Sequence, residues 1–247
     1  EGAKALAQWL TLEGRRSSLT EWLGQVASDN RIHGNINNIG AWTGRCAHNG
    51  PNTANIASPF KGKVAKNAVE VIKQKYDHQL RQCWTTPEGS WLVGCDADGI
   101  QLRVLADYMW RHFDADMYAK AIMEGNKDDE TDIHNVNKRA LGINHCDRDD
   151  AKTFIYAWLL GAGVAKTASI LRVGEGEATN ARKRFETNVE GLADIKRKLV
   201  PYIAEKGFFL GYDGRQVKVP SEHKTLAGIL QNGESVLMKH TLINFHK

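Results

Sequence analysis

The sequence has no apolar run that approaches the ~20 residues of a membrane-spanning helix, and its four cysteines form no Cys-x-x-Cys pair. The first absence predicts a protein without a membrane partner. The second argues against a zinc or redox site of that spacing and is typical of reduced thiols in a cytosol. Repeats and low-complexity tracts are also missing. What remains is a globular composition of 247 residues, with 42% hydrophobic and 25% charged residues.

The amino end has neither an initiator methionine nor the basic-then-apolar order of a signal peptide. This pattern indicates a cut rather than a natural start, and we expect the chain to be a piece of a longer protein, either a split-gene product or a proteolytic core. The net charge is +4, and lysines and arginines gather in two basic regions. The first runs from Lys61 to Arg81 and includes Lys63 and Lys66, and the second runs from Arg182 to Lys198. Each region is compatible with a nucleic-acid surface or with a solvated helix face.

Apolar spacing predicts helices over 3–27, 64–80, 99–113, 148–160, 177–205 and from 225 onward. A hairpin is expected over 31–45, turning near Asn37-Asn38, and another over 208–219 with a two-residue turn at Asp213-Gly214. The apolar run Trp91–Cys95 predicts a short buried strand.

Asp96 follows this expected strand directly. A carboxylate at the carboxyl end of a strand lies where open sheets place their chemistry, and its oxygens suit Mg²⁺. Asp98, two residues later, is better explained as the cap of the next helix, because Gln101 completes a capping-box spacing.

Three side chains at steps of four lie on one stripe of the expected 148–160 helix: Arg148, Lys152 and Tyr156. Two cations and an aromatic ring suit a nucleoside triphosphate, with charge for the phosphates and a ring for the sugar and base. The alternative is a basic helix face exposed to solvent. Thr43-Gly44-Arg45 is a weaker signal, a small-residue turn that presents an arginine to a nucleic-acid backbone or groove.

The order of these segments along the chain resembles that in family A DNA polymerases, and the resemblance covers nearly the whole chain. It is greatest to the replicative polymerases of podovirus-type bacteriophages. Residues 95–103 are similar to motif A, and Asp132-Ile133-His134 resembles a tripeptide of the fingers. The most specific match, residues 148–163, resembles motif B, the O helix. Residues 31–52 resemble the segment that leads into the palm, and 212–215 with 230–231 resemble a later palm hairpin and helix.

The resemblance implies an α+β fold, a polymerase right hand with an incomplete palm sheet and an inserted helical fingers subdomain. Three segments are expected. Residues 1–109 form the N-terminal palm-proximal segment and the palm with motif A, 110–205 form the fingers with the O helix, and 206–247 form a palm hairpin and helix that stop before motif C.

The implied reaction is attack of a primer 3′-hydroxyl on the α-phosphate of a dNTP, with two Mg²⁺ ions. The implied metal ligands are Asp96 and the Ala97 carbonyl, and the implied catalytic residues are Asp96 and Lys152. The implied dNTP-binding residues are His134, Arg148, Lys152, Tyr156 and Gln101. The implied contacts to primer-template DNA are Arg45, Gly161 and Gln231. Such an enzyme would act in the cytoplasm of an infected bacterial host or of a bacterium.

The sequence departs from the family pattern at three places. The His-Asp-Glu of motif C is absent. Because one carboxylate holds two divalent ions poorly, we expect the chain to be inactive alone and to need a complementary chain that carries this motif. Gln101 stands where a glutamate usually blocks a ribose 2′-hydroxyl, which predicts slightly relaxed sugar discrimination. Leu160 replaces a tyrosine beside Gly161.

Other classes stay open at this stage. A catalytically inactive DNA-binding fragment would use the same basic residues. A haloacid-dehalogenase-type phosphatase would use Asp96 as nucleophile and Asp98 as acid and base, but it requires strand–helix alternation downstream. A single-subunit RNA polymerase shares the helix pattern, although motif A fits it less well.

Overall fold

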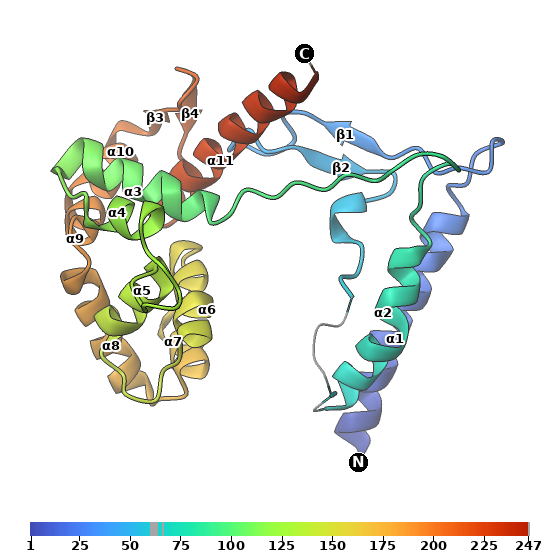
Figure 1. The fold of residues 1–247 in the computed structure, drawn as a ribbon, viewed down its shortest axis with the longest axis horizontal. Coiled ribbons are helices and arrows are strands. Elements are labelled where there is room, and N and C mark those ends of the chain that lie inside the picture. Colours follow the sequence, from blue (N-terminus) through green and yellow to red (C-terminus); the bar gives the residue numbers. More distant parts are fainter. Residues whose placement is uncertain (60–63, 66, 247) are drawn as a thin grey trace. The chain divides into compact units, whose positions relative to one another are not determined.

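The computed structural model describes residues 1–59, 64–65 and 67–246 (Figure 1). The chain divides into two compact units, one formed by residues 1–40 and 46–96, the other by residues 41–45 and 97 onward. Lys61, Lys63 and Lys66, which belong to the first predicted basic group, lie outside the described residues. The boundary between the units does not coincide with the expected borders near 110 and 206, so the three-segment division stays a prediction.

Two helices dominate the first unit, α1 (Gly2–Leu23) and α2 (Ala68–Gln82), which lie side by side in Figure 1. Asn67 begins α2 by accepting a hydrogen bond from the Glu70 amide. Across the two helices, Arg15 Nε donates to Asp77 Oδ1 at 2.7 Å, and the Asp77 side chain is only 5% exposed. The short strands β1 (Asn35–Asn37) and β2 (Ala47–Asn49) form an antiparallel pair, followed by the 3₁₀ turn η1 (Thr53–Asn55).

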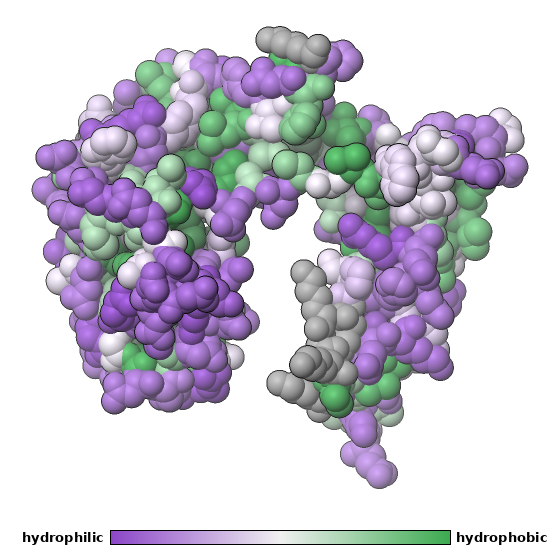
Figure 2. Space-filling model, in the orientation of Figure 1, coloured by the Kyte–Doolittle hydropathy of each residue, from purple (hydrophilic) through white to green (hydrophobic). Residues whose placement is uncertain are grey.

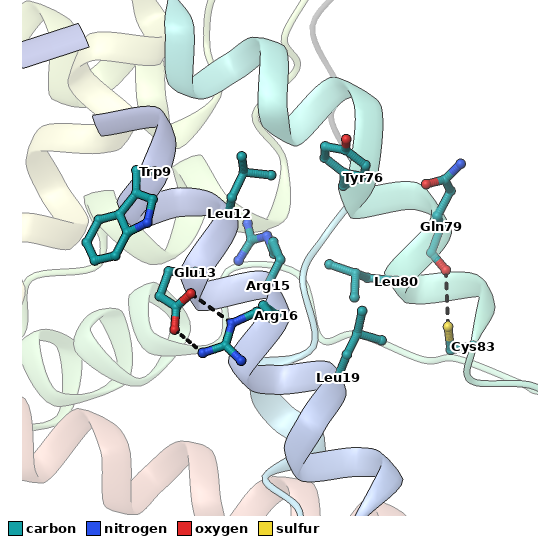
Figure 3. A pocket seen from close by; sticks show the side chains of 10 residues that line it. All are labelled: Trp9, Leu12, Glu13, Arg15, Arg16, Leu19, Tyr76, Gln79, Leu80 and Cys83. Carbon is teal, nitrogen blue, oxygen red and sulfur yellow. Dashed lines mark hydrogen bonds and ion pairs between the residues drawn. The ribbon is translucent and has the colours of Figure 1, made fainter. Parts of the chain in front are cut away.

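An apolar groove of about 440 Å³ lies between α1 and α2. Figure 3 shows Leu12 and Leu19 of α1 opposite Leu80 of α2, with an ion pair between Glu13 and Arg16 beside them. None of the residues that the sequence singles out for chemistry lines this groove. It is therefore a feature of helix packing in this unit and separate from the candidate site.

The second unit is mainly helical. Its elements are α3 (Ile100–Phe113), α4 (Met117–Met123), α5 (Ile133–Leu141), α6 (Arg148–Leu159), α7 (Val164–Leu171), α8 (Glu175–Asn188), α9 (Leu192–Asp194), the π-helical turn η2 (Ile195–Leu199), α10 (Val200–Lys206), the strands β3 (Phe208–Leu210) and β4 (Gln216–Lys218), and α11 (Glu222–His246). Its core joins α3 to α5, α6 and α8 through fully buried side chains such as Leu105, Leu141, Phe154 and Phe185. On the face drawn in Figure 2, hydrophilic residues predominate over α5 and α8.

Most predicted helices are confirmed within a few residues, and the exceptions have local causes. The expected helix 177–205 breaks after Asn188, because Gly191 takes a φ of +77° before α9. The hairpin predicted over 208–219 forms, although Leu210 is paired with Gln216, so residues 211–215 form a longer turn than predicted. The hairpin predicted over 31–45 is displaced, because Asn37 is paired with Ala47, and its second strand lies beyond the predicted end.

The predicted buried strand at Trp91–Cys95 is wrong. The segment forms no strand, and Trp91, Leu92 and Val93 are 90%, 79% and 87% exposed. Among the described residues no strand pairs with it, and a single strand leaves its backbone groups and both faces in water. The described helices also include none long and apolar enough to cross a membrane.

Candidate functional site

Helix α6 presents the predicted stripe because its two faces differ in chemistry. Asp147 caps it by accepting from the Asp150 amide at 2.7 Å, and the Asp150 carboxylate accepts from the Asp147 amide in return. The buried face consists of Ala151, Phe154, Ile155, Trp158 and Leu159. On the other face Arg148 and Tyr156 are half-buried and Lys152 is exposed. The sequence therefore predicted this helix, its start and its stripe correctly.

A carboxylate holds Arg148 against the neighbouring helix. Arg148 Nη2 donates to Asp132 Oδ2 at 2.6 Å, and its Nε lies 3.1 Å from the same oxygen. Asp132 is also the N-cap of α5, where it accepts from the amides of His134 and Asn135. The buried Asp132 carboxylate thus caps the start of α5 and also orients Arg148, the first residue of α6. Because His134 lies in the first turn of α5, it is placed beside Arg148.

The electrostatics of this cluster depend on the ion pair. Burial alone would raise the pKa of Asp132, but the hydrogen bonds and positive charge of Arg148 outweigh it, and the pKa of Asp132 is lowered. The pKa of His134 is lowered by burial and then by the positive charges of Arg148 and Lys152. His134 is therefore a neutral imidazole in a cationic environment at pH 7, and its Nδ1 is buried without a hydrogen-bond partner.

The start of α3 completes this side of the site. The ring of Tyr156 lies 6.4 Å from that of His134, centroid to centroid. A Cβ placed on Gly99 would lie 4.0 Å from the Tyr156 hydroxyl oxygen, so the beginning of α3 faces the stripe. Asp98 contributes negative charge to both His134 and Arg148. The predicted capping role of Asp98 is wrong, because Gly99 is the N-cap of α3 and Gln101 binds elsewhere.

The loop that carries Arg45 is fastened to α11. Gly44 has a φ of +86°, which suits glycine, and its carbonyl accepts from Ser235 Oγ and from Lys239 Nζ, both at 2.6 Å. Asn232 Nδ2 donates to the Thr43 carbonyl at 3.0 Å. These three hydrogen bonds hold residues 41–45 on one face of α11, and Gln231 lies half-buried on the same helix.

Arg45 and Gln101 meet at a residue that the sequence did not single out. Gln101 Nε2 donates to Glu234 Oε2 at 2.9 Å, and Arg45 Nη2 lies 3.6 Å from Glu234 Oε1. Glu234 follows Gln231 by three positions, a helical spacing that could have indicated a shared face. Asp132 was quoted only as part of a tripeptide, although its N-cap position was readable from the sequence.

Gly161 follows α6 with a φ of +85°, and a Cβ there would lie 2.7 Å from the ring of His223. Leu160, its neighbour, is 55% exposed. Gly161 therefore ends α6 in a left-handed conformation that suits glycine, beside the ring of His223 at the start of α11. The roles predicted for Gly161 and the other site residues stay predictions.

The second predicted basic region is mostly engaged within the protein. Its paired members are Arg182 with the Ala162 carbonyl, Arg184 with Glu177, Lys196 with Glu186 and Lys198 with Asp194. These partners favour a structural role over a free nucleic-acid surface.

The predicted magnesium ligands are not supported by a ready-made site. Asp96 is exposed and belongs to the first unit, and Ala97 belongs to the second. Among the described residues no group of three or more histidines, cysteines, aspartates or glutamates could hold a metal ion. The donor set of this chain thus does not fit two ions by itself, and we derive no chemical step through them.

His134 gives a testable pH dependence. Because its pKa is lower in the folded chain than the ordinary 6.5, the unfolded chain binds the proton more readily. Neutral His134 therefore contributes its full stability above pH 6.5, and this contribution is lost as the pH falls below 6.5. Urea unfolding across this range should show a falling free energy of unfolding on acidification, with a smaller slope in His134→Gln.

The control for this prediction is His240→Gln, because His240 is exposed on α11. It should keep the pH dependence of the parent chain. An unchanged slope in His134→Gln would contradict the assignment of the effect to His134.

The fold is that of a polymerase domain. It matches the POL domain of Pol1 from M. smegmatis, solved in complex with DNA primer-template and dNTP, with a TM-score of 0.67 and 22% identity over 90% of this chain and 39% of that chain. The family profile described as DNA polymerase family A matches residues 1–236. The chain belongs to this family. The predicted resemblance and the predicted α+β fold class are confirmed, and the phosphatase alternative is not favoured.

Similar proteins include phage DNA polymerases and a DNA polymerase gamma. The DNA-directed DNA polymerases of Enterobacteria phage T3 and Escherichia phage T7 are each 34% identical over 240 residues, which cover 90% of this chain and 32% of each relative. DNA polymerase gamma of Schizosaccharomyces pombe is 28% identical over 162 residues, 59% of this chain and 15% of that protein. The chain thus spans about a third of the length of the phage relatives.

Proposed function

We propose that this chain is the nucleotide-binding and primer-binding part of a template-directed DNA polymerase. The reaction is attack of a primer 3′-hydroxyl on the α-phosphate of a dNTP, with release of pyrophosphate. The observation that carries the proposal is the cluster of Arg148, Lys152 and Tyr156 on one face of α6 beside His134. Membership of the polymerase family and the names of the phage relatives support it.

The cluster suits the triphosphate of a dNTP. Arg148 presents a guanidinium whose fork can bind phosphate oxygens, and Lys152 adds a second cation one turn along the helix. Catalysis of phosphoryl transfer rests mainly on positioning and electrostatic stabilisation, which fixed cations supply. In this proposal Lys152 also donates a proton to the leaving pyrophosphate, and Tyr156 packs against the sugar.

The primer side of the proposal rests on the loop fastened to α11. Arg45 and Gln231 would read acceptors on the minor-groove edge at the primer terminus, where correct base pairs look alike. Gly161 would leave room beside the templating base. The partners proposed are therefore primer-template DNA and dNTPs, in an infected bacterial host.

Two Mg²⁺ ions are part of the proposal, with Asp96 and the Ala97 carbonyl as ligands. Such ions, if completed by a further carboxylate, would supply positive charge at the reacting oxygens. The described residues offer no cluster that would hold both ions, and the sequence has no His-Asp-Glu. We therefore propose that a complementary chain with this motif supplies the other carboxylate.

Primer extension with Mg²⁺ and dNTPs tests the function. The chain is assayed alone and mixed with a segment that carries the His-Asp-Glu hairpin. We expect extension only in the mixture, with a loss of more than a hundredfold in Asp96→Ala, because removal of one essential group commonly costs this much. Asp194→Ala, which removes an aspartate outside the site, is the matched control.

Extension by the chain alone would refute the requirement for a second chain. Primer-template binding without extension in either case would favour the inactive DNA-binding alternative. Absence of both binding and extension would refute the proposed function.

A further inference from the structure

One carboxylate contacts two residues that the sequence assigns to different parts of the reaction. Glu234 Oε2 accepts a hydrogen bond from Gln101 Nε2 at 2.9 Å, and Glu234 Oε1 lies 3.6 Å from Arg45 Nη2. Gln101 is the residue expected at the sugar of the nucleotide, and Arg45 is expected at the primer terminus. The Glu234 side chain is 20% exposed, so water competes only in part for its oxygens.

The surrounding elements hold this carboxylate in place. Gln101 lies in the first turn of α3, and α3 packs against α11, which carries Glu234. The loop of Arg45 is fastened to the same helix by Ser235 and Lys239. Because all three backbones are fixed relative to one another within this unit, the contact is built into the fold rather than formed by two flexible surface chains.

We propose that Glu234 is a positioning residue that orients the Gln101 amide and thereby contributes to the discrimination between deoxyribonucleotides and ribonucleotides. The inference rests on the proposed function. A free glutamine amide can turn its oxygen or its NH₂ group toward a sugar, because the two ends are similar in size. The hydrogen bond to Glu234 commits the NH₂ group to α11, so the amide oxygen is the end that faces elsewhere.

Charge supports the same conclusion. Gln101 lacks the negative charge of a glutamate, and Glu234 supplies one within hydrogen-bond distance of it. Arg45 balances this charge through a longer and partly exposed contact, with side chains 47% and 20% exposed. Such exposed pairs are weak, so Arg45 can turn its other donors to DNA at small cost while the Gln101 contact persists.

The test compares the parent chain with Glu234→Leu, which leaves the Gln101 NH₂ group without its acceptor. Each protein is bound to a primer-template that ends in a dideoxynucleotide, the complementary dNTP and the corresponding rNTP are titrated in Mg²⁺, and the ratio of their affinities is measured. We expect this ratio to fall about fivefold in Glu234→Leu, the equivalent of one ordinary hydrogen bond. Glu205→Leu, which removes an exposed carboxylate from α10, should leave the ratio unchanged.

The double variant Gln101→Glu with Glu234→Gln exchanges the carboxylate and the amide across the same contact. It should keep most of the parent ratio, whereas Gln101→Glu alone places two carboxylates against each other and should not. A second measurement does not need nucleotide: the side-chain NH₂ protons of Gln101 should exchange slowly in the NMR spectrum of the parent chain and fast in Glu234→Leu.

The outcomes separate this inference from the proposed function. If the parent chain discriminates between the two nucleotides and Glu234→Leu discriminates equally well, the role of Glu234 is refuted and the polymerase function stands. If the parent chain binds neither nucleotide, the proposed function fails and the specificity role fails with it. Unchanged exchange of the Gln101 protons in Glu234→Leu would refute the contact itself.

Discussion

Replacement of Arg148 by alanine is expected to abolish triphosphate binding and to lower the free energy of unfolding by about 2–3 kcal/mol, the range for hydrogen bonds to charged groups. Two guanidinium nitrogens of Arg148 contact Asp132 Oδ2, at 2.6 Å and 3.1 Å. The Arg148 side chain is 28% exposed and the Asp132 side chain is 12% exposed. Truncation leaves the Asp132 carboxylate buried beside α5 without its cation. The fold and the ligand site are therefore both affected.

A second variant separates these two effects. Asp132→Asn breaks the same ion pair but keeps a side-chain oxygen that can cap α5. It should lose less stability than Arg148→Ala, about 1 kcal/mol, because the charge that loses its partner is then that of Arg148, which is 28% exposed, rather than that of Asp132, which is 12% exposed. It should also bind triphosphate at least as tightly as the parent chain, because Arg148 can then bind the phosphates without first breaking an ion pair with a carboxylate.

Urea unfolding and dNTP titration of the parent chain, Arg148→Ala, Arg148→Lys and Asp132→Asn make the comparison. Arg148→Lys keeps the charge but cannot make the two-pronged contact, so an intermediate affinity is expected. If Asp132→Asn weakened triphosphate binding as much as Arg148→Ala, the ion pair would be needed for the shape of the site, and the direct role of Arg148 would be refuted.

The ion pair has a consequence for how nucleotide enters. In the structure Arg148 is occupied by Asp132, and His134 is uncharged because burial and two neighbouring cations lower its pKa. A bound triphosphate would draw Arg148 away from Asp132 and would favour a proton on His134. In the proposed function, the triphosphate would therefore replace an internal carboxylate at Arg148 rather than water alone.

The sequence was sufficient for those parts of the site that one helix encodes. The stripe of Arg148, Lys152 and Tyr156 follows from a spacing of four, and the predicted start of the helix at Arg148 agrees with the structure. Helical contacts are local, so a short window of sequence contains most of the information. The same holds for α3, whose apolar residues repeat at helical spacing.

The sequence failed where distant segments decide the structure. The run Trp91–Cys95 has the composition of a buried strand, but a strand needs a neighbour, and none among the described residues pairs with it. The contact between Gln101 and Glu234 joins positions 133 residues apart. Side-chain identity alone could not show that Gln101 binds α11 instead of capping α3.

Gly161→Ala is expected to lower the free energy of unfolding by about 1–2 kcal/mol, the cost of a left-handed conformation in a residue with a Cβ. Gly161 has a φ of +85°, and its new methyl group would lie 2.7 Å from two atoms of the His223 ring. Both effects act at the junction between α6 and the start of α11. The matched control is Gly176→Ala, because a Cβ on Gly176 in α8 meets nothing within 4 Å.

The control should change stability in the opposite direction. Alanine is favoured over glycine in a helix, by about 1 kcal/mol in the interior and by less in the first turn, where Gly176 lies, so Gly176→Ala should be slightly more stable than the parent chain. Urea unfolding of both variants, and of Gly161→Ala combined with His223→Ala, separates backbone strain from the contact with the ring. His223 is exposed and can turn away, so its removal should recover only a small part of the loss.

A full recovery in the double variant would instead assign the cost to crowding between Gly161 and α11. That result would mean that the end of α6 is held by its contact with α11 more than by its own backbone conformation. Since Arg148, Lys152 and Tyr156 are positioned by the same helix, a shift at Gly161 should then also weaken triphosphate binding. If the strain is confined to the backbone at residue 161, triphosphate binding should be unchanged. Urea unfolding and dNTP titration together therefore distinguish a local turn from a junction that sets the position of α6.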